Sequence, residues 1–124
     1  GFTPQSENRL GGPRVQGRGE QKDAVIEDAV AVQEAGASAV VLEMVPADVA
    51  KKITRILRIP TIGIGAGAAT DGQVLVWTDM AGMTAWSPRF SKRFGDVGGA
   101  LASAAVSFRD EVKGRGFPTE ENSF

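Results

Sequence analysis

Cysteine and histidine are both absent from the 124 residues of this chain. Without cysteine, the chain forms no disulfide bond and offers no thiolate ligand to a metal ion. Without histidine, it lacks the residue that serves most often as a general base and as a ligand for transition metals. Any acid–base chemistry must therefore fall to aspartate, glutamate, lysine or the hydroxyl residues.

An excess of charge of one sign is also missing, as are long apolar runs. The 14 basic and 15 acidic side chains leave a net charge of −1, so nothing favours binding to nucleic acid or to an anionic membrane surface. No apolar segment is long enough to span a bilayer, and no export signal is visible. With 42% hydrophobic residues, the composition is that of an ordinary soluble protein. We therefore expect one small domain located in the cytoplasm.

Hydrophobic periodicity predicts helices that alternate with strands. The predicted helices span 20–35, 46–58 and 97–112, and the predicted strands span 39–45, 60–67 (with a glycine loop at its end) and 73–77. In the second helix, Val49, Ile53, Ile56 and Leu57 form the predicted apolar face. Residues 1–20 are loop-like, and the sequence favours a disordered terminus over a structured loop above an active site. The order of elements predicts an α/β fold with parallel strands joined by right-handed crossovers.

A single carboxylate, Glu43, interrupts the run of β-forming residues at 39–45, which ends at Pro46. A continuous apolar run predicts a strand that is covered on both faces. An unpaired ionised carboxylate costs on the order of several kcal/mol in such a place, so Glu43 needs a partner or an opening to solvent. At the C-terminal end of a barrel strand, this acid would be a candidate catalytic residue. The alternative is a strand-end glutamate that points into water, and the residue alone favours neither interpretation.

The glycine-rich stretch 63–68 formally satisfies the dinucleotide fingerprint G-x-G-x-x-A. That fingerprint requires a helix to open at the loop, whereas a turn at Asp71 and a further strand follow here. Glycines at 63, 65 and 67 instead allow a ligand or another backbone segment to approach closely. Tight packing at a barrel rim is the slightly favoured explanation, ahead of direct contact with a ligand.

Two further groups of charged residues have ordinary explanations. Arg89, Lys92 and Arg93 could hold an anionic substrate tail, but a solvated basic face is the commoner meaning of such a cluster. Asp71 and Asp79 could contribute carboxylates to a site, although turn formation and capping explain both. No pair of nucleophile and base is visible, and no residue is assigned to a metal.

Six stretches together resemble the ketopantoate hydroxymethyltransferase family. They are 1–5 (GFTPQ), 15–18 (VQGR), 41–46 (VLEMVP), 61–67 (TIGIGAG), 71–76 (DGQVLV) and 117–124 (FPTEENSF). These stretches occur in the order and spacing of that family and cover almost the whole chain. Each would be weak alone, whereas the ordered set is specific.

The resemblance implies a (β/α)8 TIM barrel with parallel strands and an enzyme of pantothenate biosynthesis. The implied reaction transfers a hydroxymethyl group from 5,10-methylenetetrahydrofolate to the keto acid 3-methyl-2-oxobutanoate, giving 2-dehydropantoate. It also implies Mg²⁺ as Lewis acid and template, a homo-oligomer, and a glutamate at the position of Glu43 as proton acceptor. An apolar setting would raise the proton affinity of that glutamate towards the working pH.

Length sets a limit on what the resemblance implies. A (β/α)8 barrel takes roughly 250 residues, so we expect residues 1–124 to be the C-terminal portion of one barrel domain, with the N-terminal half absent. The family's Mg²⁺ ligands would lie in the absent half, no folate-contacting residue is assigned, and the fragment alone should be inactive. Two alternatives stay open: a non-catalytic half-barrel that acts as an interaction module, and a TIM-barrel enzyme that binds phosphate at the 63–67 loop.

Overall fold

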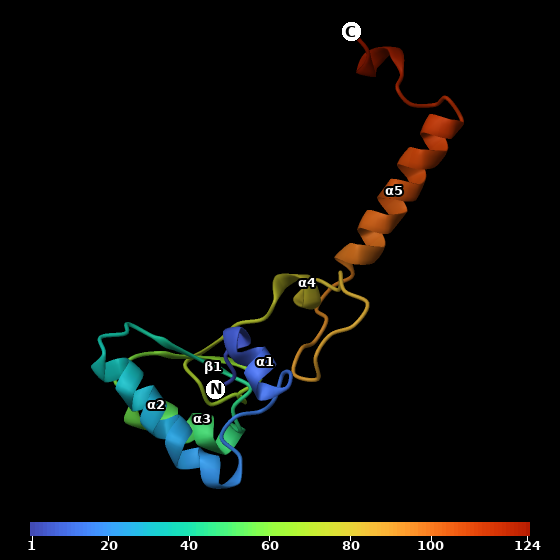
Figure 1. The fold of residues 1–124 in the computed structure, drawn as a ribbon. Helices are drawn as coiled ribbons and strands as arrows, with labels where there is room; N and C mark the ends of the chain where they lie inside the picture. Colours follow the sequence, from blue (N-terminus) through green and yellow to red (C-terminus); the bar gives the residue numbers. More distant parts are fainter. The chain divides into compact units, whose positions relative to one another are not determined.

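The structure is a computed structural model that describes residues 1–124. The chain divides into two compact units, Gly1–Leu75 and Val76–Phe124, which appear in Figure 1 as the blue-to-green and the yellow-to-red parts of the ribbon. The first unit contains the sheet, and the second contains the longest helix.

Three parallel strands form the sheet of the first unit, in the order β1 (Val40–Glu43), β2 (Thr61–Ile64) and β3 (Gly72–Gln73). Helix α2 (Lys22–Glu34) precedes β1, and helix α3 (Ala47–Ile56) connects β1 to β2. Gly36 follows α2 with a φ of 94°, a left-handed conformation that favours glycine at the end of a helix. The parallel α/β arrangement predicted from the sequence is confirmed.

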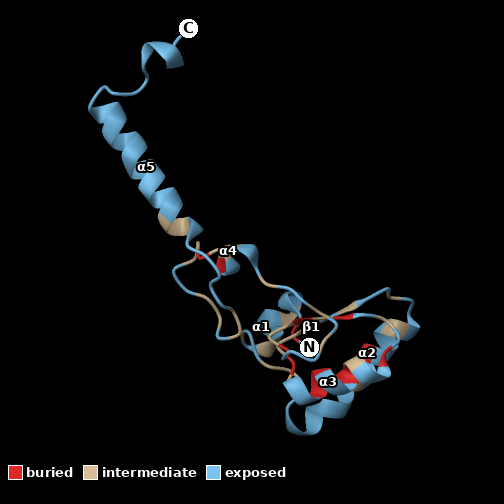
Figure 2. Ribbon diagram, turned by 180° about the vertical axis from the view of Figure 1, so that it is seen from behind, coloured by how far each residue is buried: buried red, intermediate tan, exposed pale blue.

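The hydrophobic core lies between the sheet and helices α2 and α3. Its buried members are Val25, Ala29, Leu42, Val45, Val49, Ala50, Ile53, Leu57 and Ala66. The buried positions, red in Figure 2, gather on these two helices and β1. Val49, Ile53 and Leu57 recur every four residues and confirm the predicted apolar face of α3. Ile56 was also placed on that face, and this was wrong, because its side chain is 46% exposed.

The opposite face of the sheet carries no helix of this unit. Val41 is 55% exposed, whereas its neighbour Leu42 is 2% exposed. The prediction that β1 is covered on both faces is therefore wrong for this chain. The apolar run had suggested two covered faces, but side chains alternate along a strand, and α2 and α3 cover only the side on which Leu42 lies.

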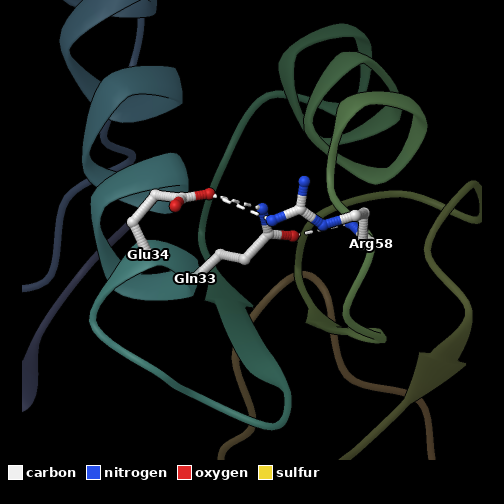
Figure 3. Close-up of polar contacts among 3 residues, drawn as sticks. All are labelled: Gln33, Glu34 and Arg58. Carbon is white, nitrogen blue, oxygen red and sulfur yellow. Dashed lines mark hydrogen bonds and ion pairs between the residues drawn. The ribbon is translucent and has the colours of Figure 1, made fainter.

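Polar contacts tie the ends of α2 and α3 together. The backbone N–H of Arg58, just after α3, donates to Oε1 of Gln33 at 2.6 Å. The Arg58 guanidinium donates to Oε1 of Glu34 at 3.2 Å, and Figure 3 shows these three residues side by side. The Arg58–Glu34 pair is well exposed, so its own contribution to stability is small. Its effect is to fix where α3 ends against the last turn of α2.

A second set of polar contacts joins β2 to the loop before β3. Oδ2 of Asp71 accepts hydrogen bonds from the backbone N–H of Thr61 at 2.8 Å and from its hydroxyl at 3.0 Å. These bonds lower the pKa of Asp71 below its ordinary value because they favour the ionised carboxylate. The fully buried Thr61 hydroxyl also lies 2.8 Å from that of Thr54 in α3. Asp71 thus has a structural role in the sheet, as turn chemistry suggested.

The N-terminal segment is ordered, so the expectation of a disordered terminus was wrong. It contains the 3₁₀ turn η1 (Pro4–Ser6), the short helix α1 (Glu7–Leu10) and the 3₁₀ turn η2 (Gly19–Gln21). Phe2 is buried, and its backbone N–H donates to the carbonyl of Glu43 at 2.8 Å. The N–H of Gln16 donates to the carbonyl of Met44 at 2.9 Å. Backbone hydrogen bonds of this kind leave no trace in hydrophobic periodicity.

The second unit contains helices α4 (Trp77–Met80) and α5 (Val97–Lys113) and the 3₁₀ turn η3 (Glu120–Asn122). The α5 helix confirms the predicted last helix, and Asp96 caps it by accepting the Gly99 N–H at 3.0 Å. The predicted strand 73–77 is largely wrong: β3 has only two residues, and Trp77 begins α4. None of the helices has both the length and the apolar character that crossing a membrane requires.

Candidate functional site at the end of strand β1

Glu43 is the last residue of β1 and lies on the face of the sheet that α2 and α3 leave open. In the parallel pairing of β1 with β2, Val41 is in register with Ile62, and Glu43 is in register with Ile64. Residues in register on neighbouring strands point to the same face, as do residues two apart on one strand. The Glu43 carboxylate therefore shares its face with three aliphatic side chains.

The setting of Glu43 raises the proton affinity of its carboxylate. Its side chain is partly buried, and its carboxylate makes no hydrogen bond and no ion pair within the chain. Burial raises the pKa of Glu43 above its ordinary value. The resulting carboxyl group is free to accept a proton from outside the protein.

The backbone around Glu43 is held from three directions. The Glu43 carbonyl accepts the N–H of Phe2, and the Met44 carbonyl accepts the N–H of Gln16. The N–H of Met44 donates to the carbonyl of Ile64 at 2.9 Å. Met44 has a φ of 52°, a left-handed conformation that is uncommon outside glycine. Sequence reasoning missed this turn, since methionine carries no signal for it.

Two hollows open on the first unit near β1. One, of about 640 Å³, is lined by residues of the segment before α2, among them Arg14, Gln16 and Arg18. The other, of about 490 Å³, lies between the N-terminal residues, α2 and β1, and includes Asp28 and Val41 in its lining. Glu43 lines neither hollow. Gln16, which lines the first, is hydrogen-bonded to Met44, the residue after Glu43, and Val41, which lines the second, lies two residues before Glu43 in β1.

Two glycines of the stretch 63–68, Gly63 in β2 and Gly67 in the loop after it, lie close to neighbouring residues. A Cβ atom on Gly63 would lie 2.6 Å from the hydroxyl oxygen of Thr70, and one on Gly67 would lie 2.5 Å from the Cβ of Ala47. Gly67 also has a φ of 78°. These contacts favour the packing explanation for both glycines, and they leave the phosphate-binding alternative without support from these two positions.

The basic residues of the second unit are partly engaged within it. The Arg93 guanidinium donates to the carbonyls of Thr84 and Ala85 at 2.6 and 3.3 Å. The Lys92 ammonium lies 5.2 Å from the centre of the Phe94 ring, a distance typical of a cation–π contact. Arg89 is exposed. Arg93 and Lys92 therefore have structural roles, whereas the sequence had suggested that they could bind an anionic substrate tail.

Asp79, the remaining candidate carboxylate, also has a local role. It is 9% exposed, and its Oδ1 accepts the Thr84 hydroxyl at 2.8 Å. No three or more aspartate and glutamate side chains gather closely enough to hold a metal ion. The residues of this chain therefore do not fit a magnesium site by themselves.

Comparison with known proteins decides the family. A sequence model described as ketopantoate hydroxymethyltransferase matches residues 1–120. The chain belongs to the ketopantoate hydroxymethyltransferase family. Three similar curated proteins, each named 3-methyl-2-oxobutanoate hydroxymethyltransferase, come from Saccharopolyspora erythraea, Mycobacterium marinum and Rhodococcus jostii. They are 63%, 61% and 59% identical to the chain over 125 residues.

The aligned region covers 100% of this chain and 43%, 42% and 43% of those three relatives. The chain thus spans less than half the length of the curated relatives that it matches. The family resemblance recognised from six short stretches is confirmed.

Proposed function

We propose that the chain supplies the general base of a 3-methyl-2-oxobutanoate hydroxymethyltransferase, and that this base is Glu43. The carboxylate would take the proton from the carbon next to the keto group of 3-methyl-2-oxobutanoate. That carbon then forms a bond to the one-carbon unit of 5,10-methylenetetrahydrofolate, the two carbon–nitrogen bonds of that unit break, and water supplies the hydroxyl oxygen. The products are 2-dehydropantoate and tetrahydrofolate. The observation that supports this role most is an unpaired, partly buried carboxylate at the C-terminal end of a parallel strand.

The raised pKa of Glu43 suits this role. A general base works best when its pKa approaches the operating pH, because it is then ionised and still binds a proton well. Val41, Ile62 and Ile64 share the face of the sheet that carries Glu43, so the carboxylate lies in largely apolar surroundings. The left-handed turn at Met44 and the hydrogen bonds from Phe2 and Gln16 hold the base in place.

The same proposal includes a (β/α)8 barrel, of which residues 1–124 form the C-terminal portion. Three parallel strands with helices on one face are consistent with such a barrel, and the open face that carries Glu43 would be its interior. Magnesium would require ligands from outside this chain, so we assign no step to it here. A cytoplasmic location belongs to the same proposal.

Turnover in a complete protein tests the proposal. This chain would replace the matching residues of the Saccharopolyspora erythraea relative, to which it is 63% identical. The hybrid should form 2-dehydropantoate from 3-methyl-2-oxobutanoate, 5,10-methylenetetrahydrofolate and magnesium, and should form none when the folate is left out. A folded hybrid without turnover would contradict the proposal.

One observation favours self-association as a second property. The apolar residues of α5 are exposed, including Leu101 at 59% and Phe108 at 58%. Val41 is also exposed, on the open face of the sheet. Exposed apolar surface of this kind marks interaction sites, which supports the expected homo-oligomer. Light scattering on the isolated chain separates the outcomes: a defined oligomer supports an interaction module, whereas heterogeneous aggregation supports an incomplete barrel.

A further inference from the structure

A cluster of hydrogen bonds behind the end of β2 is centred on the amide group of Gln73. Its Nε2 atom donates to the carbonyl of Gly67 at 2.9 Å and to the hydroxyl of Thr70 at 2.8 Å. That hydroxyl donates in turn to the carbonyl of Gly72 at 2.9 Å. Gln73 is in register with Gly63, and a Cβ atom on Gly63 would lie 2.6 Å from the Thr70 hydroxyl oxygen and 3.1 Å from Nε2. The missing side chain of Gly63 therefore leaves the space for this cluster, and no role described above uses the cluster.

The cluster fixes the loop that leaves β2 beside the end of β1. On its other side Gly67 meets Ala47, the first residue of α3, since a Cβ atom on Gly67 would lie 2.5 Å from that of Ala47. Where the loop begins, the carbonyl of Ile64 accepts the N–H of Met44 at 2.9 Å. Met44 follows Glu43 and has the left-handed φ of 52°. The position of the loop therefore bears on the turn that holds Glu43.

We propose that Gln73 is a positioning residue for Glu43, the proposed general base, and that it acts through the loop after β2. This inference rests on the proposed function and adds a residue to it. Gln73 is in register with Gly63, and Gly63 with Leu42 of β1, so Gln73 lies on the covered face of the sheet. Glu43 lies on the opposite face. Gln73 therefore affects the base without touching it or a substrate that is bound there.

Both hydrogen bonds from Gln73 require a side chain that donates. The amide nitrogen of glutamine carries two N–H donors, one for the Gly67 carbonyl and one for the Thr70 hydroxyl. Leucine is similar in size but has no polar group, so in Gln73→Leu the Gly67 carbonyl loses this partner. The loop is then held by its packing on Ala47 and by its two ends. We expect the hydrogen bond from Met44 to Ile64 to open more often in that variant.

Steady-state kinetics of the hybrid protein test the proposal. Gln73→Leu should lower kcat about tenfold and leave the KM for the keto acid unchanged, because no group that touches the substrate is altered. In the wild-type hybrid, kcat should rise with pH through the pKa of Glu43 in the substrate complex. In Gln73→Leu this rise should move to lower pH, because a base that is held less firmly is better solvated. A loss of stability alone would leave the rise where it is.

Gln33→Leu is the matched control for the loss of a hydrogen-bonded glutamine amide. Gln33 accepts the N–H of Arg58 and donates to Glu34, at the far end of α2 from the loop. This control should lower the melting temperature while kcat and its pH dependence stay unchanged. If it alters them as Gln73→Leu does, the effect of Gln73 is not specific.

A pair of substitutions at Thr70 sharpens the test. Thr70→Val removes the hydroxyl at nearly the same shape and should lower kcat, whereas Thr70→Ser keeps the hydroxyl and should retain it. The double variant of Gln73→Leu and Thr70→Val should lose little more than Gln73→Leu alone, because the two residues share one hydrogen bond. Fully additive losses would mean that the two side chains do not act as one cluster.

Amide hydrogen exchange at Met44, followed by mass spectrometry of short peptides from the hybrid, needs no turnover. Exchange should become about tenfold faster in Gln73→Leu and stay unchanged in Gln33→Leu. Unchanged exchange at Met44, or a fall in kcat without the shift in its pH dependence, would overturn the assignment. Failure of the proposed function would instead appear as absent turnover in the wild-type hybrid, while the exchange at Met44 would still decide whether Gln73 fixes the turn.

Discussion

Two neighbouring residues of β1 lie in opposite environments. Leu42 packs in the core with 2% of its surface exposed, whereas Val41 is 55% exposed and shares the open face with Glu43. The covered face contains the apolar core and the hydrogen-bonded Thr54–Thr61 hydroxyl pair, while the open face carries an unpaired carboxylate. The comparison indicates that one face of the strand stabilises the fold and the other is available for chemistry. Substitutions on the two faces should therefore affect different measurements.

The largest expected effect is on catalysis, from Glu43→Gln in the hybrid protein. The amide keeps the size of the side chain but accepts no proton, so kcat should fall about 10²- to 10⁴-fold, the range typical of general-base catalysis. The folded state should persist, as judged by circular dichroism. Glu27→Gln, an exposed glutamate of α2, is the matched control and should leave kcat unchanged. Near-full activity of Glu43→Gln would remove the catalytic assignment.

On the covered face, Ile53→Ala should destabilise the protein. Ile53 is 0% exposed, and truncating such a residue costs about 2–5 kcal/mol through lost burial and the cavity that remains. Ile56→Ala is the matched control in the same helix, because Ile56 is 46% exposed and its truncation should cost about 0.5 kcal/mol or less. Denaturant unfolding measures both. Equal costs would mean that α3 packs with a different face than described.

A smaller effect is expected at the glycine loop, where packing and ligand binding make different predictions. Gly67→Ala adds a methyl group against Ala47 at a φ of 78°, and should cost about 1–3 kcal/mol. Gly19→Ala is the control for backbone strain alone, since Gly19 has a φ of 56° and open space around it. If Gly67→Ala destabilises no more than Gly19→Ala, packing does not explain Gly67.

Much of the first unit could be predicted from the sequence because its elements are periodic. Spacings of three and four identified α2 and α3, and β-forming runs identified β1 and β2. The apolar run by itself does not predict the exposed face of β1, because it looks the same whether a second layer comes from this chain or from elsewhere; the exposed inner face follows only from the expectation that the chain is part of a barrel. Ile56 was misplaced for a related reason: it neighbours Leu57 in sequence but lies about 100° around the helix from it.

The site was predicted only in part. Glu43 stood out as a lone acid in an apolar run, and its open face and raised pKa depend on neighbours that the structure supplies. The segment from Arg14 to Arg18 matched the family pattern but carried no chemical signal of its own. Its link to the end of β1 is a backbone hydrogen bond, from Gln16 to Met44, which any residue except proline could make.

The smallest expected effect is a pH-dependent change in stability that comes from Glu43 on the open face. Burial raises the pKa of Glu43 above its ordinary value of 4.5, so ionising this group costs more in the folded chain than in the unfolded chain. Its contribution to stability is fully present below pH 4.5 and is lost as the pH rises through the higher folded-state pKa. Glu43→Gln removes this ionisation and should therefore stabilise the protein at pH 7 but not at pH 4.

Thermal unfolding of wild type and Glu43→Gln across that pH range measures the effect. The expected gain at pH 7 is small, about 1–2 °C, because the side chain is only partly buried and solvent screens it. A difference that stays constant with pH, or a variant less stable than wild type at pH 7, would mean that the open face does not penalise the charge. The carboxylate would then lack the raised proton affinity on which its role as a base depends.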